Sequence, residues 1–394
     1  MKSLDAKIAD IRKNPSGSKA FIIADAKDAD MAFGITAPGQ KRPMNPERVL
    51  KSEMHWKTLE EYREQIRGVV RQGLVDIMLL SASNVEQLAM KERLFENSHI
   101  TPAARANDAT DIWVVRGAEY IKQPSRPFRS ATLDHIKCGE LDCDPDAPFT
   151  GADLGLYSVT FTNNFERDYE TLRAFKEFRE EAERKNFRYF LEVFDPNVET
   201  GLPPEKLDGF INDHIIRSLA GVTQKGRPLF LKIAWRGPKA MEELVAYDPQ
   251  LIVGILGGSA GTTYDAFKLI ADAQKHGARV ALFGRKINNA ENPLAFIEFL
   301  RRIVEGAITP EEAVKAYHGV LESLGVTAHR SLADDMQLTS SATSYGGSGG
   351  AKKTIVKPGG APSPAKSAPP AHDAKAASAR VAEQLARIRG RFGE

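Results

Sequence analysis

Lys232 is the residue whose setting most clearly suggests covalent chemistry, because it lies inside the apolar segment 228–234. Burial in an apolar strand disfavours the charged ammonium, which leaves some neutral amine near pH 7 to attack a carbonyl carbon. The sequence therefore predicts Lys232 as a nucleophile that forms a Schiff base. The competing interpretation is a strand-end lysine whose ammonium reaches out to solvent.

Two glycine-containing turns follow Lys232 along the chain, each directly after an apolar segment. Glycine lets backbone N–H groups approach a phosphate closely, a following helix N-terminus adds a favourable dipole, and arginine offers a forked donor. The loops after strands seven and eight of a (β/α)8 barrel are also where phosphates usually bind. Glycine-rich turns occur as well wherever a chain bends tightly, and arginine also pairs with rim carboxylates. The predicted phosphate ligands are Gly257, Gly258 and Ser259 in the first turn and Gly284 and Arg285 in the second.

Schiff-base chemistry also needs groups that move protons, and three carboxylates stand at or just beyond the ends of predicted strands. They are Asp25, Glu192 and Asp195. Trp235 and Arg236 follow the Lys232 segment directly, and we expect them to line the pocket. The alternative for each carboxylate is a solvated cap at a strand end.

The segment 134–144 mixes several types of metal ligand, because it holds one histidine, two cysteines and four carboxylates. Cys138 and Cys143 are separated by four residues, which is unlike the usual zinc spacing. The sequence favours a solvated acidic loop here, and we predict neither a metal nor a cofactor. Two cysteines are also too few for a disulfide framework and fit a reducing compartment.

The composition is that of a globular protein, with 42% hydrophobic and 27% charged residues in a chain of 394. No run of about 18 apolar residues occurs and the first residues lack an apolar signal region, so we expect a cytoplasmic protein without a membrane span. The formal net charge of +2 divides into +6 for residues 351–394 and −4 for the remainder. An acidic body with a basic tail argues against a nucleic-acid-binding core.

The elements that must position these residues repeat as strand, helix, strand along the chain. Most of the strand candidates are continuous apolar runs, which is typical of parallel strands covered on both faces. Helix-like stretches over 60–71, 167–185, 207–221 and 263–276 separate several of them. An eightfold repeat of this kind predicts an α/β fold, a (β/α)8 TIM barrel. The eight predicted strands are 20–25, 75–80, 112–115, 155–161, 188–194, 228–234, 251–256 and 279–283.

The chain divides into three predicted parts. A catalytic barrel domain spans 1–338 and contains two long insertions, 26–57 and 120–150, the first of which is placed to cover the barrel mouth. From 339 to 374 the composition shifts to Ser, Gly, Ala, Pro and Lys, and we expect a disordered linker. The last part, 375–394, is predicted to be a short amphipathic helix.

The terminal helix carries one narrow apolar stripe, formed by Val381, Leu385, Ile388 and Phe392. A helix this short is marginal alone, so we expect it to fold on a partner. The candidates are its own barrel, a shell or scaffold protein, and a membrane surface. A frayed basic terminus with chance periodicity is the alternative. A linker followed by such a helix resembles the encapsulation peptides of enzymes in bacterial microcompartments.

The segments 231–235, 257–259 and 284–288 resemble the archaeal-type class I fructose-bisphosphate aldolases, a family that also contains the thiolase acting on phosphorylated autoinducer-2. The resemblance is strongest over 187–318, is thinner over 19–118 and does not reach 339–394. It implies a (β/α)8 barrel in homo-oligomers, with phosphorylated ketoses bound as an imine of Lys232 on strand six. It also implies phosphate binding by the two glycine turns and a role for Asp25 as the family's strand-one carboxylate.

Two departures from the family pattern concern the substrate. Aldolases of this kind have Asp-His-Gly after strand one, whereas this chain has Asp25-Ala26-Lys27. The usual Gly-Arg-Asn also reads Gly284-Arg285-Lys286 here. We therefore predict a metal-independent class I aldolase acting on a phosphorylated ketose that the sequence does not specify. The alternatives are a related Schiff-base thiolase or epimerase, and an inactive barrel that serves as a scaffold through its tail helix.

Overall fold

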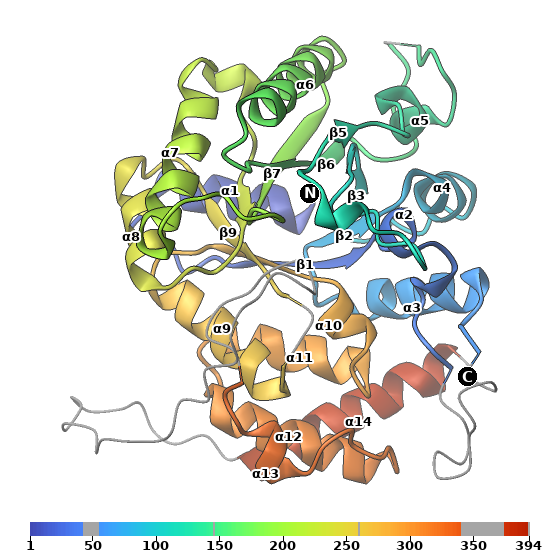
Figure 1. Ribbon diagram of the computed structural model, residues 1–394. Helices are drawn as coiled ribbons and strands as arrows, with labels where there is room; N and C mark the ends of the chain where they lie inside the picture. Colours follow the sequence, from blue (N-terminus) through green and yellow to red (C-terminus); the bar gives the residue numbers. More distant parts are fainter. Residues whose placement is uncertain (42–54, 145, 259–260, 340–373, 393–394) are drawn as a thin grey trace.

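Eight parallel strands close into a barrel that is surrounded by helices (Figure 1). The structure is a computed structural model that describes residues 1–41, 55–144, 146–258, 261–339 and 374–392. The order of hydrogen-bonded strands around the barrel is β1-β10-β9-β8-β7-β6-β3-β2. This confirms the predicted (β/α)8 fold. The strands are β1 (Ile22–Lys27), β2 (Ile77–Leu80), β3 (Thr101–Arg105), β6 (Leu154–Thr160), β7 (Arg188–Phe194), β8 (Leu231–Ile233), β9 (Val253–Leu256) and β10 (Val280–Phe283).

The third barrel strand was predicted in the wrong place. β3 is Thr101–Arg105, and it pairs with β2 and β6, whereas 112–115 lies outside every strand. The segment Thr-Pro-Ala-Ala-Arg combines small side chains with a proline and an arginine, so it lacks the apolar run by which we identified the other strands. Ile112 is nevertheless buried, because it packs with Phe194 and Leu256 at the end of the barrel.

Successive side chains of each strand point alternately into the barrel and toward the surrounding helices. Ile22 and Ala24 of β1 belong to a cluster inside the barrel, whereas Ile23 packs in the layer beneath the helices. The helix α1 (Ser3–Lys13) contributes Leu4 and Ile8 to the inner cluster. Because these residues meet the first residues of the strands, α1 closes the N-terminal end of the barrel and the opposite end carries the site.

The outer helices follow the strands as the sequence predicts, and capping boxes begin three of them, at Thr58, Thr262 and Thr309. Each cap gives the first free N–H groups of its helix a side-chain acceptor, which fixes where the helix begins. The long outer helices are α3 (Leu59–Gln72), α6 (Phe165–Arg184), α7 (Leu207–Ala220), α8 (Pro238–Tyr247), α9 (Thr263–Lys275), α11 (Pro293–Val304) and α12 (Pro310–Ser323). Shorter elements are α2 (Asp30–Phe33), α4 (Ala82–Val85), α5 (Leu133–Cys138), α10 (Arg285–Asn288), α13 (Leu332–Asp335), β4 (Asp108–Ala109) and β5 (Pro127–Phe128).

The two cysteines are joined, which corrects the expectation of reduced thiols. Helix α5 ends at Cys138, and Gly139 continues the chain with a left-handed φ of 85°. This tight turn brings the Cα atoms of Cys138 and Cys143 to 5.9 Å, within the usual range for a disulfide, and the structure contains that bond. The acidic loop is therefore a small closed ring at the tip of the second insertion.

The chain ends in a helix that docks on its own barrel. Helix α14 (Ala374–Phe392) packs against α11 and α12, and it buries Ala377, Val381 and Leu385 there. Figure 1 shows it running alongside α12 at the edge of the molecule. Two residues of the predicted stripe, Val381 and Leu385, thus pack on the chain's own barrel, the first of the three partners that the sequence allowed, whereas the side chains of Ile388 and Phe392 lie outside the described part. The predicted linker lies almost wholly outside the described residues, and none of the described helices is long and apolar enough to cross a membrane.

Candidate active site

Three polar side chains form a row inside the barrel, on the adjacent strands β6, β7 and β8. The strand register places Ser158 beside Glu192, and Glu192 beside Lys232. Each lies two positions after an inward-facing residue of its own strand, namely Leu156, Phe190 and Phe230. All three side chains therefore point into the barrel near the carboxyl ends of the strands. Lys232 Nζ lies 2.5 Å from Glu192 Oε1, with side-chain exposures of 5% and 0%. The predicted nucleophile and a predicted proton carrier are therefore in contact.

The second oxygen of Glu192 is also occupied. Its Oε2 accepts a hydrogen bond of 2.7 Å from Ser158 Oγ and lies 3.5 Å from a guanidinium nitrogen of Arg105. Oε1 has no donor in hydrogen-bond geometry among the described residues, so its contact with Lys232 is an ion pair without a directed hydrogen bond. Glu192 is thus anchored through one oxygen while the other faces the amine.

Arg105 is a site residue that sequence reasoning missed. It is the last residue of β3, it is 1% exposed, and it donates hydrogen bonds to Asp28 at 2.6 Å and to Ser158 at 3.0 Å. We missed it because the third strand was placed at 112–115. Asp28, Arg105, Glu192 and Lys232 together form what we call the charged quartet.

Asp25 does not belong to this interior group, and this corrects the assignment from the sequence. It is in register with Met78 and Phe283, whose side chains pack in the layer between strands and helices. Because side chains alternate along a strand, Ala24, Ala26 and Asp28 face inward while Asp25 faces outward. The carboxylate that faces the interior at this end of the strand is Asp28, which directly follows β1.

Asp25 instead forms a fully buried pair with Lys27. Lys27 Nζ lies 3.5 Å from Asp25 Oδ2, and neither side chain is exposed. Burial raises the pKa of Asp25 to about 6, while the nearby ammonium acts in the opposite sense. Burial also lowers the pKa of Lys27. This outer pair is a structural neighbour of the site and has no contact with Lys232 in the described structure.

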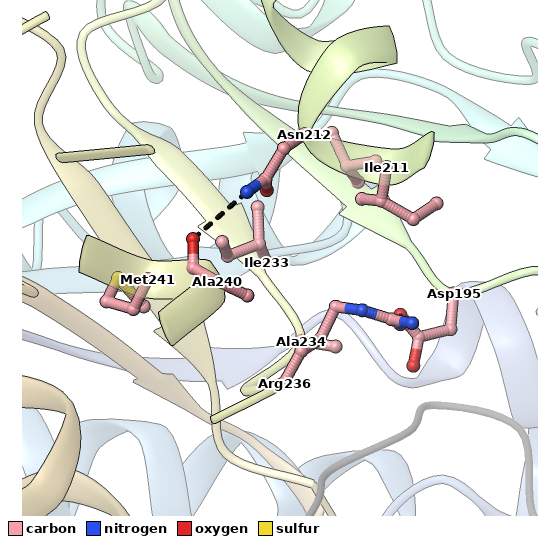
Figure 2. A pocket seen from close by; sticks show the side chains of 9 residues that line it. Asp195, Ile211, Asn212, Ile233, Ala234, Arg236, Ala240 and Met241 are labelled. Atoms are coloured by element: carbon pink, nitrogen blue, oxygen red, sulfur yellow. Dashed lines mark hydrogen bonds and ion pairs between the residues drawn. The ribbon is translucent and has the colours of Figure 1, made fainter. Parts of the chain in front are cut away.

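Asp195 and Arg236 form an ion pair just beyond the ends of β7 and β8, and Arg236 also donates to Asp208 at 2.8 Å. Burial raises the pKa of Asp195, against the effect of the adjacent guanidinium. Figure 2 shows the pair at one side of a cavity of about 10 Å³, closed on another side by Asn212, which donates to the carbonyl of Ala240. A cavity of this size holds at most about one water molecule, so it is not a substrate pocket.

Trp235 does not line the barrel interior. It is 6% exposed and lies in the layer beneath the helices, with its ring centroid 6.0 Å from that of His276. Side chains alternate along an extended segment, and Lys232 and Ala234 face inward, so the next residue, Trp235, faces outward. Arg236 is at the rim, held by its two carboxylates.

The glycines of both predicted phosphate turns are required by close packing. A Cβ at Gly257 would lie 2.1 Å from the ring of Phe283, and one at Gly284 would lie 2.9 Å from the carbonyl oxygen of Ala26. Gly258 has a left-handed φ of 61°. Ser259 lies outside the described residues. These glycines are therefore explained by the fold alone, and the N–H of Gly257 already donates to the carbonyl of Leu282 at 2.7 Å.

The N-terminus of α9 is already occupied by the chain's own carboxylates. The N–H of Thr262 donates to Asp265 and the N–H of Thr263 donates to Asp335, both at 2.8 Å. The helix dipole expected to assist phosphate binding after strand seven is thus used for capping. On the other turn, the guanidinium of Arg285 lies over the ring of Phe33, 5.7 Å from its centroid.

The residue after Arg285 is Lys286, whose side chain reaches toward the loop that follows β9. Its Nζ donates to the carbonyl of Gly261 at 2.8 Å, and burial lowers its pKa to about 8. Among the described residues no cluster of three or more His, Cys, Asp or Glu side chains is arranged to hold a metal ion. The chemistry that the described site offers is therefore that of a buried amine, a carboxylate in contact with it, and nearby cationic groups.

No protein-family model matches the chain, and no curated protein matches it either. Among solved structures, it is similar to an archaeal fructose 1,6-bisphosphate aldolase at 13% identity, over 76% of this chain and 99% of that one, with a TM-score of 0.52. A Schiff-base-forming fructose-1,6-bisphosphate aldolase matches over the same shares at 15% identity and a TM-score of 0.51. An archaeal aldolase whose catalytic lysine carries the carbinolamine intermediate matches over those shares too, at 14% and 0.50. At these identities the similarity shows a shared fold.

Proposed function

We propose that this protein is a class I aldolase that cleaves or forms a phosphorylated ketose through an imine of Lys232. The observation that carries the proposal is the buried contact between Lys232 and Glu192 on the inner face of β8 and β7. A lysine ammonium buried against a carboxylate has an acceptor for the proton that it must lose before it attacks a carbonyl. The fold shared with Schiff-base aldolases is consistent with this chemistry.

The amine would act in balanced steps. The proton of the ammonium passes to Glu192, and the neutral nitrogen then attacks the ketose carbonyl carbon, whose oxygen takes up a proton to give a carbinolamine. Loss of water leaves a protonated imine. When a base removes the proton from the hydroxyl group on the far side of the scissile bond, that bond breaks, an aldehyde leaves and the electron pair enters the iminium as an enamine.

The substrate phosphate would be held between the two glycine turns. Gly258 on one side and Gly284 on the other lie at the same end of the barrel, with the cationic Arg285 beside them. The N–H of Gly257 already donates to the carbonyl of Leu282 at 2.7 Å, so Gly257 would contribute by its lack of a side chain. Because the N-terminus of α9 is capped, we assign phosphate binding to these turns and not to the α9 dipole.

The test is trapping with borohydride in the presence of dihydroxyacetone phosphate and a panel of ketose phosphates. We expect a reduced adduct on Lys232, located by peptide mass spectrometry, and no adduct in Lys232→Ala. Lys27 is a matched internal control, because it is also a buried lysine on a barrel strand but faces outward. Folded protein that yields no adduct with any phosphorylated carbonyl, or an adduct on Lys27 only, would overturn the proposal.

The same imine also serves thiolase and epimerase reactions on phosphorylated sugars. Product analysis with the best-trapping compound distinguishes them, because only aldol cleavage releases an aldehyde. The docked position of α14 on α11 and α12 gives no support to a scaffold that acts through this helix.

A further inference from the structure

The charged quartet contains two cations and two carboxylates, and all four side chains are nearly inaccessible. Their side-chain exposures are 2% for Arg105, 9% for Asp28, 0% for Glu192 and 5% for Lys232. Water screens such buried charges poorly, so the balance of charge within the quartet governs which of its members keep their protons. Arginine does not lose its proton in proteins, so Arg105 is a fixed positive charge in this balance.

Arg105 contacts both carboxylates of the quartet. Its Nε donates to Asp28 at 2.6 Å, and another guanidinium nitrogen lies 3.5 Å from the oxygen of Glu192 that Ser158 also binds. Glu192 is therefore shared between two cations, since its other oxygen faces Lys232 at 2.5 Å. Without Arg105, Lys232 would be the single cation of a buried group that holds two carboxylates, Glu192 in contact with it and Asp28 beyond Glu192. The negative charge of both would favour the protonated form of Lys232.

We propose that Arg105 is a positioning residue that enables Lys232 to give up its proton, because it offsets the negative charge of Asp28 and Glu192. The inference deepens the proposed function, since it rests on Lys232 acting as a neutral amine. In this proposal Asp28 acts only through its contact with Arg105, and it need not touch the substrate.

In the described part of the chain, the charged groups next to the quartet have partners of their own. Asp111 has a buried carboxylate that interacts electrostatically with Glu192, and it accepts hydrogen bonds from Ser125 and Thr160. On the other flank of Lys232 the register partner is Gly254 of β9, which has no side chain. At the rim Asp195 is paired with Arg236, and on the outer face of β1 Asp25 is paired with Lys27.

The test measures the protonation of Lys232 directly and does not require turnover. The protein is exposed to formaldehyde and cyanoborohydride over a range of pH, and the initial rate of methylation at Lys232 is followed by peptide mass spectrometry. Only the neutral amine reacts, so the midpoint of the pH dependence reports when Lys232 loses its proton.

Two substitutions should move this midpoint in opposite directions. Arg105→Gln leaves two carboxylates and one cation, so we expect the midpoint to rise by about one pH unit, with about tenfold less reactive amine at neutral pH. Asp28→Asn leaves two cations and one carboxylate, so we expect a lower midpoint. Arg105→Lys keeps the charge and should stay close to the wild type.

Arg188→Gln is a matched control. Arg188 also bridges two carboxylates, Asp5 and Asp153, but it does so at the opposite end of β7. We expect its loss to leave the Lys232 midpoint unchanged. Damage to the fold would not move the midpoint in opposite directions, and circular dichroism checks that each variant is folded.

An unchanged midpoint in Arg105→Gln, or shifts of the same sign in Arg105→Gln and Asp28→Asn, would overturn the inference. Borohydride trapping is run in parallel on the same variants. Opposite shifts without any substrate adduct would instead retain the role of Arg105 and reject the proposed aldolase, so the two failures are distinguishable.

Discussion

Glu192 lies between a hydroxyl, a guanidinium and an ammonium, and its two oxygens have different tasks. One oxygen is anchored by Ser158, while the other faces Lys232. Replacement by glutamine keeps the shape and removes the proton acceptor. We expect Glu192→Gln to reduce turnover of the best-trapping ketose phosphate by about 10²–10⁴-fold, as is usual when a general acid or base is lost. Steady-state rates test this expectation, and a loss below threefold would exclude Glu192 as the proton carrier.

The outer pair of Asp25 and Lys27 should make stability depend on pH. The pKa of Asp25 rises from 3.8 in the unfolded chain to about 6 in the folded protein, so the folded state binds more protons between these values. A carboxyl shifted in this direction lowers the free energy of unfolding as pH rises from about 4 to 6.

The corresponding prediction concerns Asp25→Asn, which cannot titrate. Relative to the wild type, the stability of this variant should increase by about 3 kcal/mol between pH 3 and pH 7, given about 1.4 kcal/mol per unit of pKa. Urea unfolding at several pH values measures it. A difference between the two proteins that does not change with pH would contradict the assigned protonation of Asp25.

At the scale of elements, α12 and α14 approach each other closely at one glycine. A Cβ at Gly319 would lie 2.6 Å from Ser378 Oγ and 3.3 Å from its Cβ, so the two helices approach closely at this point. We expect Gly319→Leu to detach α14, and limited proteolysis should then release a C-terminal fragment. Gly68→Leu on α3 is the control, because open space surrounds that glycine. Equal resistance of both variants to protease would show that α14 does not need this contact.

The disulfide of the second insertion should support its loop and leave the chemistry unaffected. Cys138 and Cys143 close a ring five positions apart whose tip is exposed, with Leu141 at 64%. The chain-entropy model gives about 2 kcal/mol for a loop this short. We expect the double variant Cys138→Ser and Cys143→Ser to lose at most about this much stability, measured by urea unfolding, with borohydride trapping at Lys232 unchanged. Loss of trapping would indicate that the loop shapes the site.

At the scale of the whole molecule, seven of the eight strands and the inward lysine could be predicted because continuous apolar runs identify buried parallel strands. β3 could not be predicted, since Thr101–Arg105 consists of small residues, a proline and an arginine. That error concealed Arg105. Asp25 was assigned to the site and Asp28 was not considered, because a motif match does not reveal side-chain direction, which depends on where the strand begins. The target of the α14 stripe also needed the structure, because the apolar pattern fits any apolar partner.

The position of α14 also has a consequence for synthesis. The helix that covers α11 and α12 follows every barrel strand along the chain, so a ribosome completes the barrel strands well before it releases Val381 and Leu385. Until then the nascent barrel presents an uncovered apolar strip, the kind of surface on which unfinished chains aggregate or recruit chaperones. A chain truncated before α14 would therefore yield a closed barrel that is prone to self-association.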